Sequence, residues 1–206
     1  LIPEKKQSIQ KIFNDNLENI YDEINIGLSK ISKFKVLFIG ETIIDVYKFV
    51  QGVGKPPKED IISTLLQSNK KYFGGIIAAA KHLQDFCKKV DVLTNIDDFK
   101  LIESIVKKNS NLNIIKVNND KLNQPITKTR YLSKHFNKKL FETYNQINST
   151  NSQTFKKKTK AFLNKNLKNY DLVIVLDFGH GFLDDNLIKI IQNKSKYLGL
   201  NVQTNS

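Results

Sequence analysis

The sequence is poor in the residues that most often mark a disulfide framework, a metal site or base-specific recognition of nucleic acid. Its 206 residues include one cysteine, Cys87, and one arginine, Arg130. A single cysteine excludes an internal disulfide, and the three histidines stand far apart without the Cys/His spacing of a metal site. We therefore predict no protein-bound structural metal. We expect Cys87 to be a buried, unreactive thiol on the apolar side of a helix.

Long apolar segments are also missing. No window approaches roughly 18 consecutive apolar residues, the length that a membrane-spanning helix needs. The N-terminus has no charged region followed by an apolar run and a small-residue cleavage site. These absences predict a cytoplasmic protein without a membrane partner. The composition, 40% hydrophobic and 26% charged, is typical of a folded globular protein.

Positive charge, in contrast, is abundant, with a formal net charge of +13. This excess raises the alternative of a basic nucleic-acid-binding protein. Nearly all of it is lysine spread along the chain, whereas base recognition relies on arginine and non-specific binding on a clustered patch. The one cluster falls in a helical pattern and is interpreted as a solvated helix face: Lys156, Lys157, Lys158 and Lys160. Nucleic acid therefore ranks last among the partners that we expect.

Apolar periodicity predicts an α/β fold. Apolar positions three and four apart over residues 4–31 predict an amphipathic helix before the first strand. Apolar runs predict strands at 36–39, 61–66, 90–94, 112–117, 125–132, 139–144, 172–176 and 198–202, and helices at 76–88, 97–108, 154–169 and 184–194. Alternating strands and helices imply a mostly parallel sheet covered on both faces. The strands at 125–132 and 139–144, joined by a polar turn at 135–138, predict a hairpin apart from that sheet.

Polar residues follow several of these strands. We expect a polar loop containing Asp45, a loop at 51–58, the pair Gly74–Gly75 at a helix start, Asp177 after the strand 172–176, and a polar stretch from Asn201. In a parallel sheet, ligands bind beyond the carboxyl ends of the strands. A carboxylate there accepts hydrogen bonds from sugar hydroxyls, and paired glycines let a ligand approach helix N–H groups. Together these groups predict a ligand site along one rim, although each alone is more simply interpreted as a cap or a turn.

The order of these motifs resembles the ribokinase-like (PfkB) carbohydrate kinases. Within that family, the sequence particularly resembles the heptose-phosphate kinase branch. This branch includes HldE-like proteins, in which the kinase is joined to a nucleotidyltransferase. Residues 36–47 (VLFIGETIIDVY) resemble the first strand and substrate-binding Asp loop, and residues 73–83 (FGGIIAAAKHL) resemble the Gly-Gly signature. Residues 125–130 (PITKTR) resemble a Thr-Lys-Arg strand of that branch, and residues 171–183 (DLVIVLDFGHGFL) its strand ending in Asp-Tyr-Gly-Lys-Gly. Residues 201–206 (NVQTNS) fall where the family has an Asn-containing strand end.

The resemblance implies a ribokinase-like α/β fold with a small β lid over residues 34–206, after a helical linker at 1–33. It implies transfer of phosphate from ATP, with Mg²⁺, to a hydroxyl of a sugar or sugar phosphate, and a homodimer formed through the lid. No Walker-type phosphate loop is present, which fits a phosphate site of the ribokinase kind. The implied site residues are Asp45, Gly74 and Gly75 for the sugar, Lys128 and Arg130 for an anionic group on the substrate, and Asp177, Asn201 and Gln203 for the nucleotide phosphates.

The chain departs from the family pattern in three places. Ala78 replaces an asparagine that contacts sugar, and His180 replaces the lysine of the Gly-Lys-Gly turn. The Gly-Ala-Gly-Asp motif, which supplies the phosphate-stabilising helix N-terminus and the catalytic base, does not occur. We therefore expect the N-terminal two-thirds of such a kinase, inactive by itself, with its catalytic base beyond Ser206. The alternative that Ala78 and His180 favour is a degenerate sugar- or nucleotide-binding domain of a nucleotidyltransferase-linked sugar pathway protein.

Overall fold

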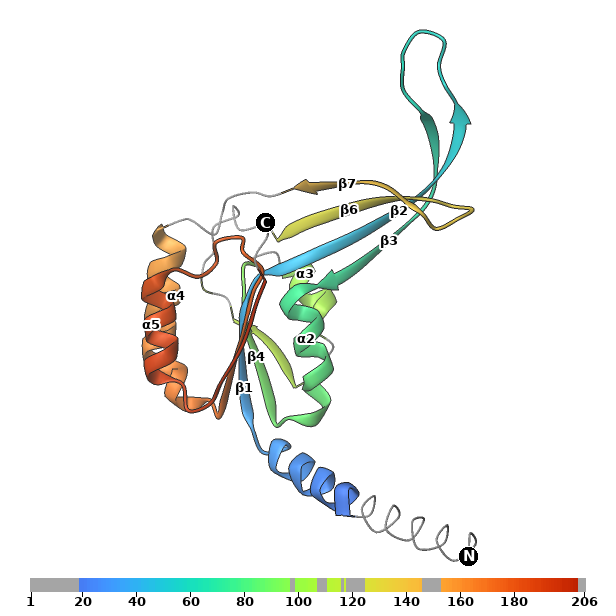
Figure 1. The fold of residues 1–206 in the computed structure, drawn as a ribbon. Helices are drawn as coiled ribbons and strands as arrows, with labels where there is room; N and C mark the ends of the chain where they lie inside the picture. The colour runs from blue at the N-terminus through green and yellow to red at the C-terminus, as the bar shows by residue number, and fades with distance from the viewer. Residues whose placement is uncertain are drawn as a thin grey trace, which may run out of the picture.

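The computed structural model describes residues 19–96, 99–106, 111–115, 117, 125–145 and 153–203. These residues form two β-sheets, a five-stranded core sheet and a four-stranded lid sheet (Figure 1). The predicted N-terminal helix is present at residues 19–31, whereas its predicted portion at 4–18 lies outside the described residues. No helix in the described ranges is long and apolar enough to cross a membrane.

The core sheet has the order β5-β4-β1-β8-β9, and every pairing in it is parallel. Its strands are β1 (Lys35–Gly40), β4 (Lys89–Leu93), β5 (Leu112–Ile115), β8 (Leu172–Asp177) and β9 (Leu198–Val202). The strand β1 lies at the centre because its apolar run suits a strand buried on both faces. From β1 the strand order runs outward to β5 on one side and to β9 on the other. The predicted parallel sheet is confirmed.

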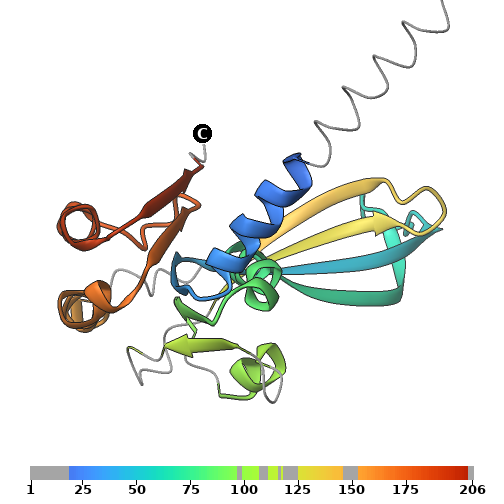
Figure 2. The same ribbon diagram turned by 90° about the horizontal axis from the view of Figure 1, so that it is seen from below.

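Helices cover both faces of the core sheet. The helices α2 (Gly75–Leu83) and α3 (Phe99–Ile105), with the 3-10 helix η1 (Gln84–Phe86), lie on one face. The helices α4 (Gln153–Asn166) and α5 (Asp185–Lys194), with the 3-10 helix η3 (Leu167–Asn169), lie on the other. Figure 2 shows the two helical layers from below. Each layer has its own buried apolar cluster, so the prediction of helices on both faces is confirmed.

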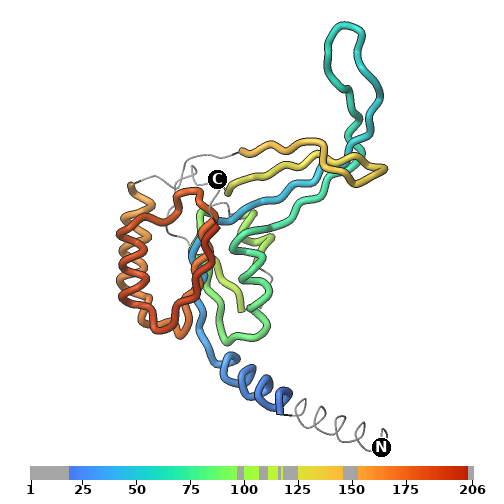
Figure 3. Tube along the Cα trace, viewed as in Figure 1, coloured from blue at the N-terminus to red at the C-terminus, as the bar shows by residue number. Residues whose placement is uncertain are grey.

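The lid sheet has the order β3-β2-β6-β7. Its strands are β2 (Thr42–Gly54), β3 (Ser63–Gly74), β6 (Ile126–Ser133) and β7 (Lys139–Asn145). Two antiparallel hairpins, β2–β3 and β6–β7, are joined by a parallel pairing between β2 and β6. The trace in Figure 3 shows the tip of the β2–β3 hairpin projecting beyond the rest of the molecule. The hairpin predicted near residues 125–144 is confirmed as half of this larger lid.

Three predictions for residues 41–66 are corrected. Asp45 lies inside β2 rather than in a polar loop, β2 continues to Gly54 into the predicted loop at 51–58, and β3 begins at Ser63 and runs to Gly74 instead of spanning 61–66. The apolar residues of segment 43–50 are isoleucine, valine and aromatics, which favour strands. The backbone of this segment pairs with β3 on one side and β6 on the other.

The position of Cys87 also differs from the prediction. The helix α2 ends at Leu83, and Cys87 follows η1 instead of lying on a helix that continues to residue 88. The thiol is nevertheless buried, and this burial raises its pKa. A raised pKa keeps the thiol protonated at neutral pH, which supports the interpretation of Cys87 as unreactive.

Candidate functional site

A buried carboxylate stands where the chain leaves the core sheet for the lid. Glu41, between β1 and β2, is fully buried and accepts hydrogen bonds from the backbone N–H groups of Phe178 (3.1 Å) and Phe182 (3.3 Å). Burial raises the pKa of the Glu41 carboxyl group, against the opposing effect of these hydrogen bonds. Sequence reasoning missed Glu41, although a carboxylate directly after a buried strand was an available signal. Its contacts tie the start of the lid to the turn after β8.

That turn begins with Asp177, the last residue of β8. The Asp177 carboxylate accepts a hydrogen bond from the N–H of Gly179 (2.9 Å), and its carbonyl accepts one from the N–H of Gln203 (2.8 Å). Gly179 and Gly181 have φ angles of 75° and 82°, which glycine adopts without steric cost. Asn201 is exposed on β9, next to Leu176 of β8. The structure therefore gathers Asp177, Asn201 and Gln203 at the carboxyl ends of β8 and β9.

The predicted glycine pair forms the junction between the lid and α2. Gly74 ends β3, and Gly75 opens α2 with a φ of 55°. A Cβ on Gly75 would lie 2.7 Å from the carbonyl oxygen of Glu41, and a Cβ on Gly74 would overlap Oδ2 of Asp45. Glycine is required at Gly75 because of its positive φ and the close backbone of Glu41, whereas a side chain at Gly74 would displace the Asp45 carboxylate. The structure thus brings Gly74 next to Asp45, whereas Gly75 lies against Glu41 and Ile43.

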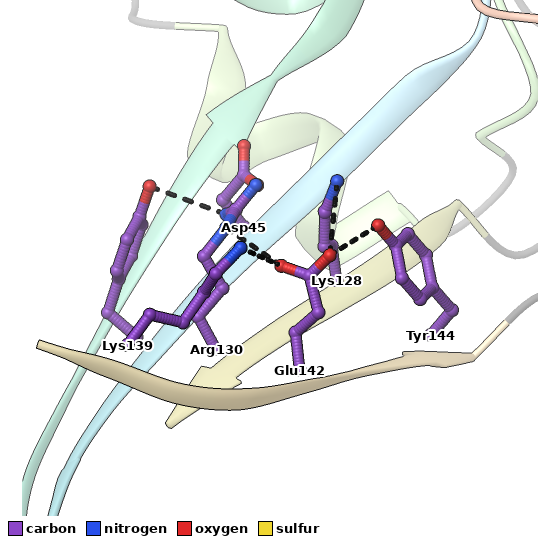
Figure 4. A network of polar contacts seen from close by, with 7 residues as sticks. Asp45, Lys128, Arg130, Lys139, Glu142 and Tyr144 are labelled. Atoms are coloured by element: carbon purple, nitrogen blue, oxygen red, sulfur yellow. Dashed lines mark hydrogen bonds and ion pairs between the residues drawn. The ribbon is translucent and has the colours of Figure 1, made fainter. Parts of the chain in front are cut away.

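One face of the lid carries a network of charged side chains from β2, β6 and β7 (Figure 4). The Arg130 guanidinium forms an ion pair and hydrogen bond with Asp45, and its Nε lies 3.5 Å from Oε2 of Glu142. The Lys128 ammonium lies 3.8 Å from Oε1 of Glu142. Lys128 and Arg130 therefore share a face, as expected from their spacing along a strand. Sequence reasoning missed Glu142, because its partners lie on a neighbouring strand.

The environment of the network keeps its members charged. The Tyr144 hydroxyl donates a hydrogen bond to Glu142 (2.6 Å), which lowers the pKa of that carboxyl group, as does a hydrogen bond from Lys139 (3.1 Å). Burial of the Arg130 guanidinium is the largest single effect and opposes its charge, but the hydrogen bond and charge of Asp45, with the charges of Tyr47 and Glu142, together outweigh it and raise the pKa of Arg130. The Arg130 guanidinium and the Glu142 carboxylate are therefore both ionised at neutral pH.

A pocket of about 300 Å³ opens beside this network and is lined by Asp45, Tyr47, Phe49, Lys70 and Tyr72. The rings of Tyr47 and Tyr72 meet edge to face, with centroids 5.7 Å apart and an interplanar angle of 77°. Along the β2–β3 hairpin, Asp45 is paired with Tyr72, and Tyr47 with Lys70. The charged groups of Asp45 and Lys70, together with the aromatic rings of Tyr47 and Tyr72, suit a small, polar ring compound.

The site residues form two groups rather than one rim. The lid group contains Asp45, Lys128 and Arg130, and the core-sheet group contains Asp177, Asn201 and Gln203. The prediction of a single rim is corrected because the chain enters the lid at Thr42 and carries Asp45 away from the end of β1. Among the described residues there is no cluster of three or more His, Cys, Asp or Glu side chains that could hold a metal ion.

Comparison with known proteins gives a likeness in structure and none in sequence. No protein-family model matches the chain, and no curated protein matches it. A carbohydrate kinase from Agrobacterium tumefaciens has a TM-score of 0.50 and 13% identity, over 81% of this chain and 53% of that one. Phosphofructokinase-2 from Escherichia coli, in complex with fructose-6-phosphate, has a TM-score of 0.51 and 8% identity, over 82% of this chain and 54% of that one. The tetrameric inhibited form of the same enzyme has a TM-score of 0.51 and 8% identity, over 81% and 54%.

These matches confirm the ribokinase-like α/β fold with its lid. The solved structures that share it include sugar kinases. The chain spans about half the length of these structures. At such low identity the likeness shows the fold alone, so the heptose-phosphate kinase branch, the cofactors and the site roles stay predictions.

Proposed function

We propose that this chain is the acceptor-binding part of an ATP-dependent carbohydrate kinase that transfers phosphate to a hydroxyl of a sugar or sugar phosphate. The observation that carries the proposal is the setting of Asp45. Its Oδ1 is paired with Arg130, and its Oδ2 lies toward Gly74 at the junction of the lid and α2. A carboxylate held in this way can accept hydrogen bonds from sugar hydroxyls, and the aromatic rings of Tyr47 and Tyr72 offer apolar contact to the ring.

The second reactant in this proposal is ATP, which the sequence resemblance implies. Asp177, Asn201 and Gln203 lie at the carboxyl ends of the parallel strands, where ligands of such sheets bind. Asn201 and Gln203 are exposed, so their amides can donate hydrogen bonds to phosphate oxygens. Mg²⁺ would arrive with ATP and be held largely by phosphate and water oxygens. A homodimer through the lid belongs to the same proposal.

We infer further that these 206 residues transfer no phosphate by themselves. Phosphoryl transfer depends on groups that stabilise the transferring phosphate and on a base that activates the acceptor hydroxyl. The Gly-Ala-Gly-Asp motif that supplies both in the resembling family is absent from the sequence. The alternative, a degenerate binding domain favoured by Ala78 and His180, predicts the same sugar binding. It differs in predicting that a longer form of the protein would also transfer no phosphate.

Calorimetric titration of sugars and sugar phosphates into the chain tests the proposal. We expect Asp45→Asn to weaken binding about 10- to 100-fold, because a hydrogen bond to a charged group contributes about 1.5–3 kcal/mol. The matched control is Asp60→Asn, in the connection between β2 and β3, where the carboxylate is 92% exposed and pairs only with Lys55 among the described residues. That variant should bind as the unaltered chain does.

Two results would contradict the proposal. If no pentose, hexose or heptose and no phosphate of one binds, or if Asp45→Asn binds with unchanged affinity, Asp45 is not part of an acceptor site. Protein-dependent phosphorylation of a sugar by the 206-residue chain with ATP would contradict the inferred inactivity while leaving the assignment as a kinase intact.

A further inference from the structure

The charges on the lid are unevenly balanced. Lys128 and Arg130, the two residues that the sequence resemblance assigns to an anionic group, share the carboxylates of Asp45 and Glu142. Lys139 also pairs with Glu142, so the three cations of the network share two carboxylates and each cation already has an acidic partner. A ligand anion approaching it must compete with carboxylates already in place. The network is thus better built to fix Asp45 than to attract a phosphate.

Lys70 differs from both of them. It is exposed on β3, lines the lid pocket together with Asp45, and makes no ion pair with an acidic side chain among the described residues. Its ammonium group lies over the ring of Phe49, 5.9 Å from nitrogen to ring centroid. Within the described part of the chain, Lys70 therefore gives the pocket a cation that is not held in an ion pair.

The position of Lys70 relative to Asp45 defines the shape of a ligand. Asp45 pairs with Tyr72 across the hairpin, and two residues further from the junction with α2, Tyr47 pairs with Lys70. Residues two apart on a strand point to the same face. A hydroxyl-bearing ring against Tyr47 and Tyr72, with its hydroxyls at Asp45, would direct a substituent at its other end toward Lys70. An anionic substituent there would form a charge-assisted hydrogen bond.

We propose that Lys70 binds the anionic group of the acceptor and that the acceptor is therefore a sugar carrying a phosphate or carboxylate distant from the hydroxyls that Asp45 holds. This inference rests on the proposed function and assigns to Lys70 the role that sequence resemblance gave to Lys128 and Arg130. Lys128 and Arg130 position Asp45 through Glu142 and the direct Arg130–Asp45 pair.

The test compares charged and neutral forms of one sugar on matched variants. Pentose, hexose and heptose monophosphates, each paired with its unphosphorylated sugar, are titrated into the unaltered chain, Lys70→Gln and Lys71→Gln. Lys71 is the matched control because it pairs with Val46 and so points to the opposite face of the lid. We expect Lys70→Gln to weaken binding of the sugar phosphate roughly tenfold or more and to leave binding of the sugar unchanged. Lys71→Gln should change neither.

The outcomes separate the two proposals. If Asp45→Asn abolishes binding and Lys70→Gln has no effect, or weakens sugar and sugar phosphate equally, the role of Lys70 is wrong and the proposed function stands. If the unaltered chain binds neither form of any sugar, both proposals fail. If Lys128→Gln weakens binding of only the phosphorylated sugar and Lys70→Gln changes neither affinity, the anion site belongs to the network and not to Lys70. Circular dichroism melts establish that each variant is folded.

Discussion

The core sheet and the lid sheet differ in what covers them. In β1 every residue after Lys35 is buried, whereas in β3 no residue is buried. Two helical layers cover the core sheet, while side chains on the lid remain in contact with solvent. Apolar burial therefore stabilises the core, and the lid is left with side chains that can meet a ligand. The residues that determine the fold and those proposed for binding are largely separate.

Carboxylates show the same difference. Asp91 of the core is buried and hydrogen-bonded to Tyr170, Asn113 and Lys89, each at 2.8 Å. Glu142 of the lid has a side chain 21% exposed, among three cations and a tyrosine. A buried carboxylate must have its hydrogen bonds satisfied, whereas a partly exposed one can exchange partners with water or a ligand. Exchange of that kind suits a surface that binds and releases a substrate.

The largest effect is expected when a phenylalanine is truncated to alanine in the core and in the lid and the two losses of stability are compared. Phe182 is fully buried against Phe155, with ring centroids 5.4 Å apart, and Phe182→Ala should lower the free energy of unfolding by about 3–5 kcal/mol. Phe141 is 55% exposed and stacks on Tyr131 in the lid, so Phe141→Ala should cost about 0.5–1.5 kcal/mol. Urea denaturation of both variants measures the two losses. Equal losses would contradict the division between core and lid.

A smaller effect is expected at the buried carboxylate of Glu41. In Glu41→Gln, one of the two backbone N–H groups would face the amide NH₂, which cannot accept its hydrogen bond. This loss should lower the free energy of unfolding by about 1–3 kcal/mol at neutral pH. The pKa of Glu41 is raised in the folded state, so the folded chain binds this proton more readily than the unfolded chain does. As pH falls through the raised pKa toward the ordinary glutamate value, the unaltered chain should gain stability relative to Glu41→Gln. Urea titrations of both proteins at several pH values measure this difference, and a decrease on acidification would refute it.

The smallest effect, with the opposite dependence on pH, is expected in the lid. Glu142→Gln removes partly exposed ion pairs and should lower the free energy of unfolding by less than about 1 kcal/mol at neutral pH. The pKa of Glu142 is lowered in the folded state, so its stabilising contribution is present above the unfolded pKa and is lost as pH falls through the folded one. The same urea titrations should show the two proteins converging in acid. A difference that widens in acid would show that Glu142 is not held as an anion.

The sequence predicts the core well because its signals are local. The apolar runs of β1, β4 and β8 and the periodicity of α4 and α5 reflect burial that is visible in the residues themselves. Exposure of Lys157 and Lys160 on α4 likewise confirms the interpretation of the lysine cluster as a solvated face. The pair Gly74–Gly75 marked the start of α2 correctly, and at Gly75 the close backbone of Glu41 leaves no room for a Cβ.

The lid was predicted only in part because its signals depend on distant strands. In β2 the side chains on both faces are mostly half-buried, which hides the alternation that marks a strand, and glycines near its end favoured a loop. Motif resemblance singled out Asp45, Lys128 and Arg130 as binding residues but did not predict their contacts in the network. Glu142 and the lining residue Lys70 had no motif to mark them. Their relation to Asp45 appears only once β2 is paired with β3 and β6.

The parallel pairing of β2 with β6 makes the lid dependent on the rest of the chain. Each lid hairpin can close over a short loop, but Asp45 and Arg130 are separated by 85 positions in sequence. The residues between them include α2, β4, α3 and β5 of the core, so the pairing of β2 with β6 joins two hairpins that these core elements separate along the chain. No short contiguous peptide can reproduce the Asp45–Arg130 pair. The lid is therefore not formed by one contiguous segment, and a peptide carrying a single hairpin would hold only one member of the Asp45–Arg130 pair.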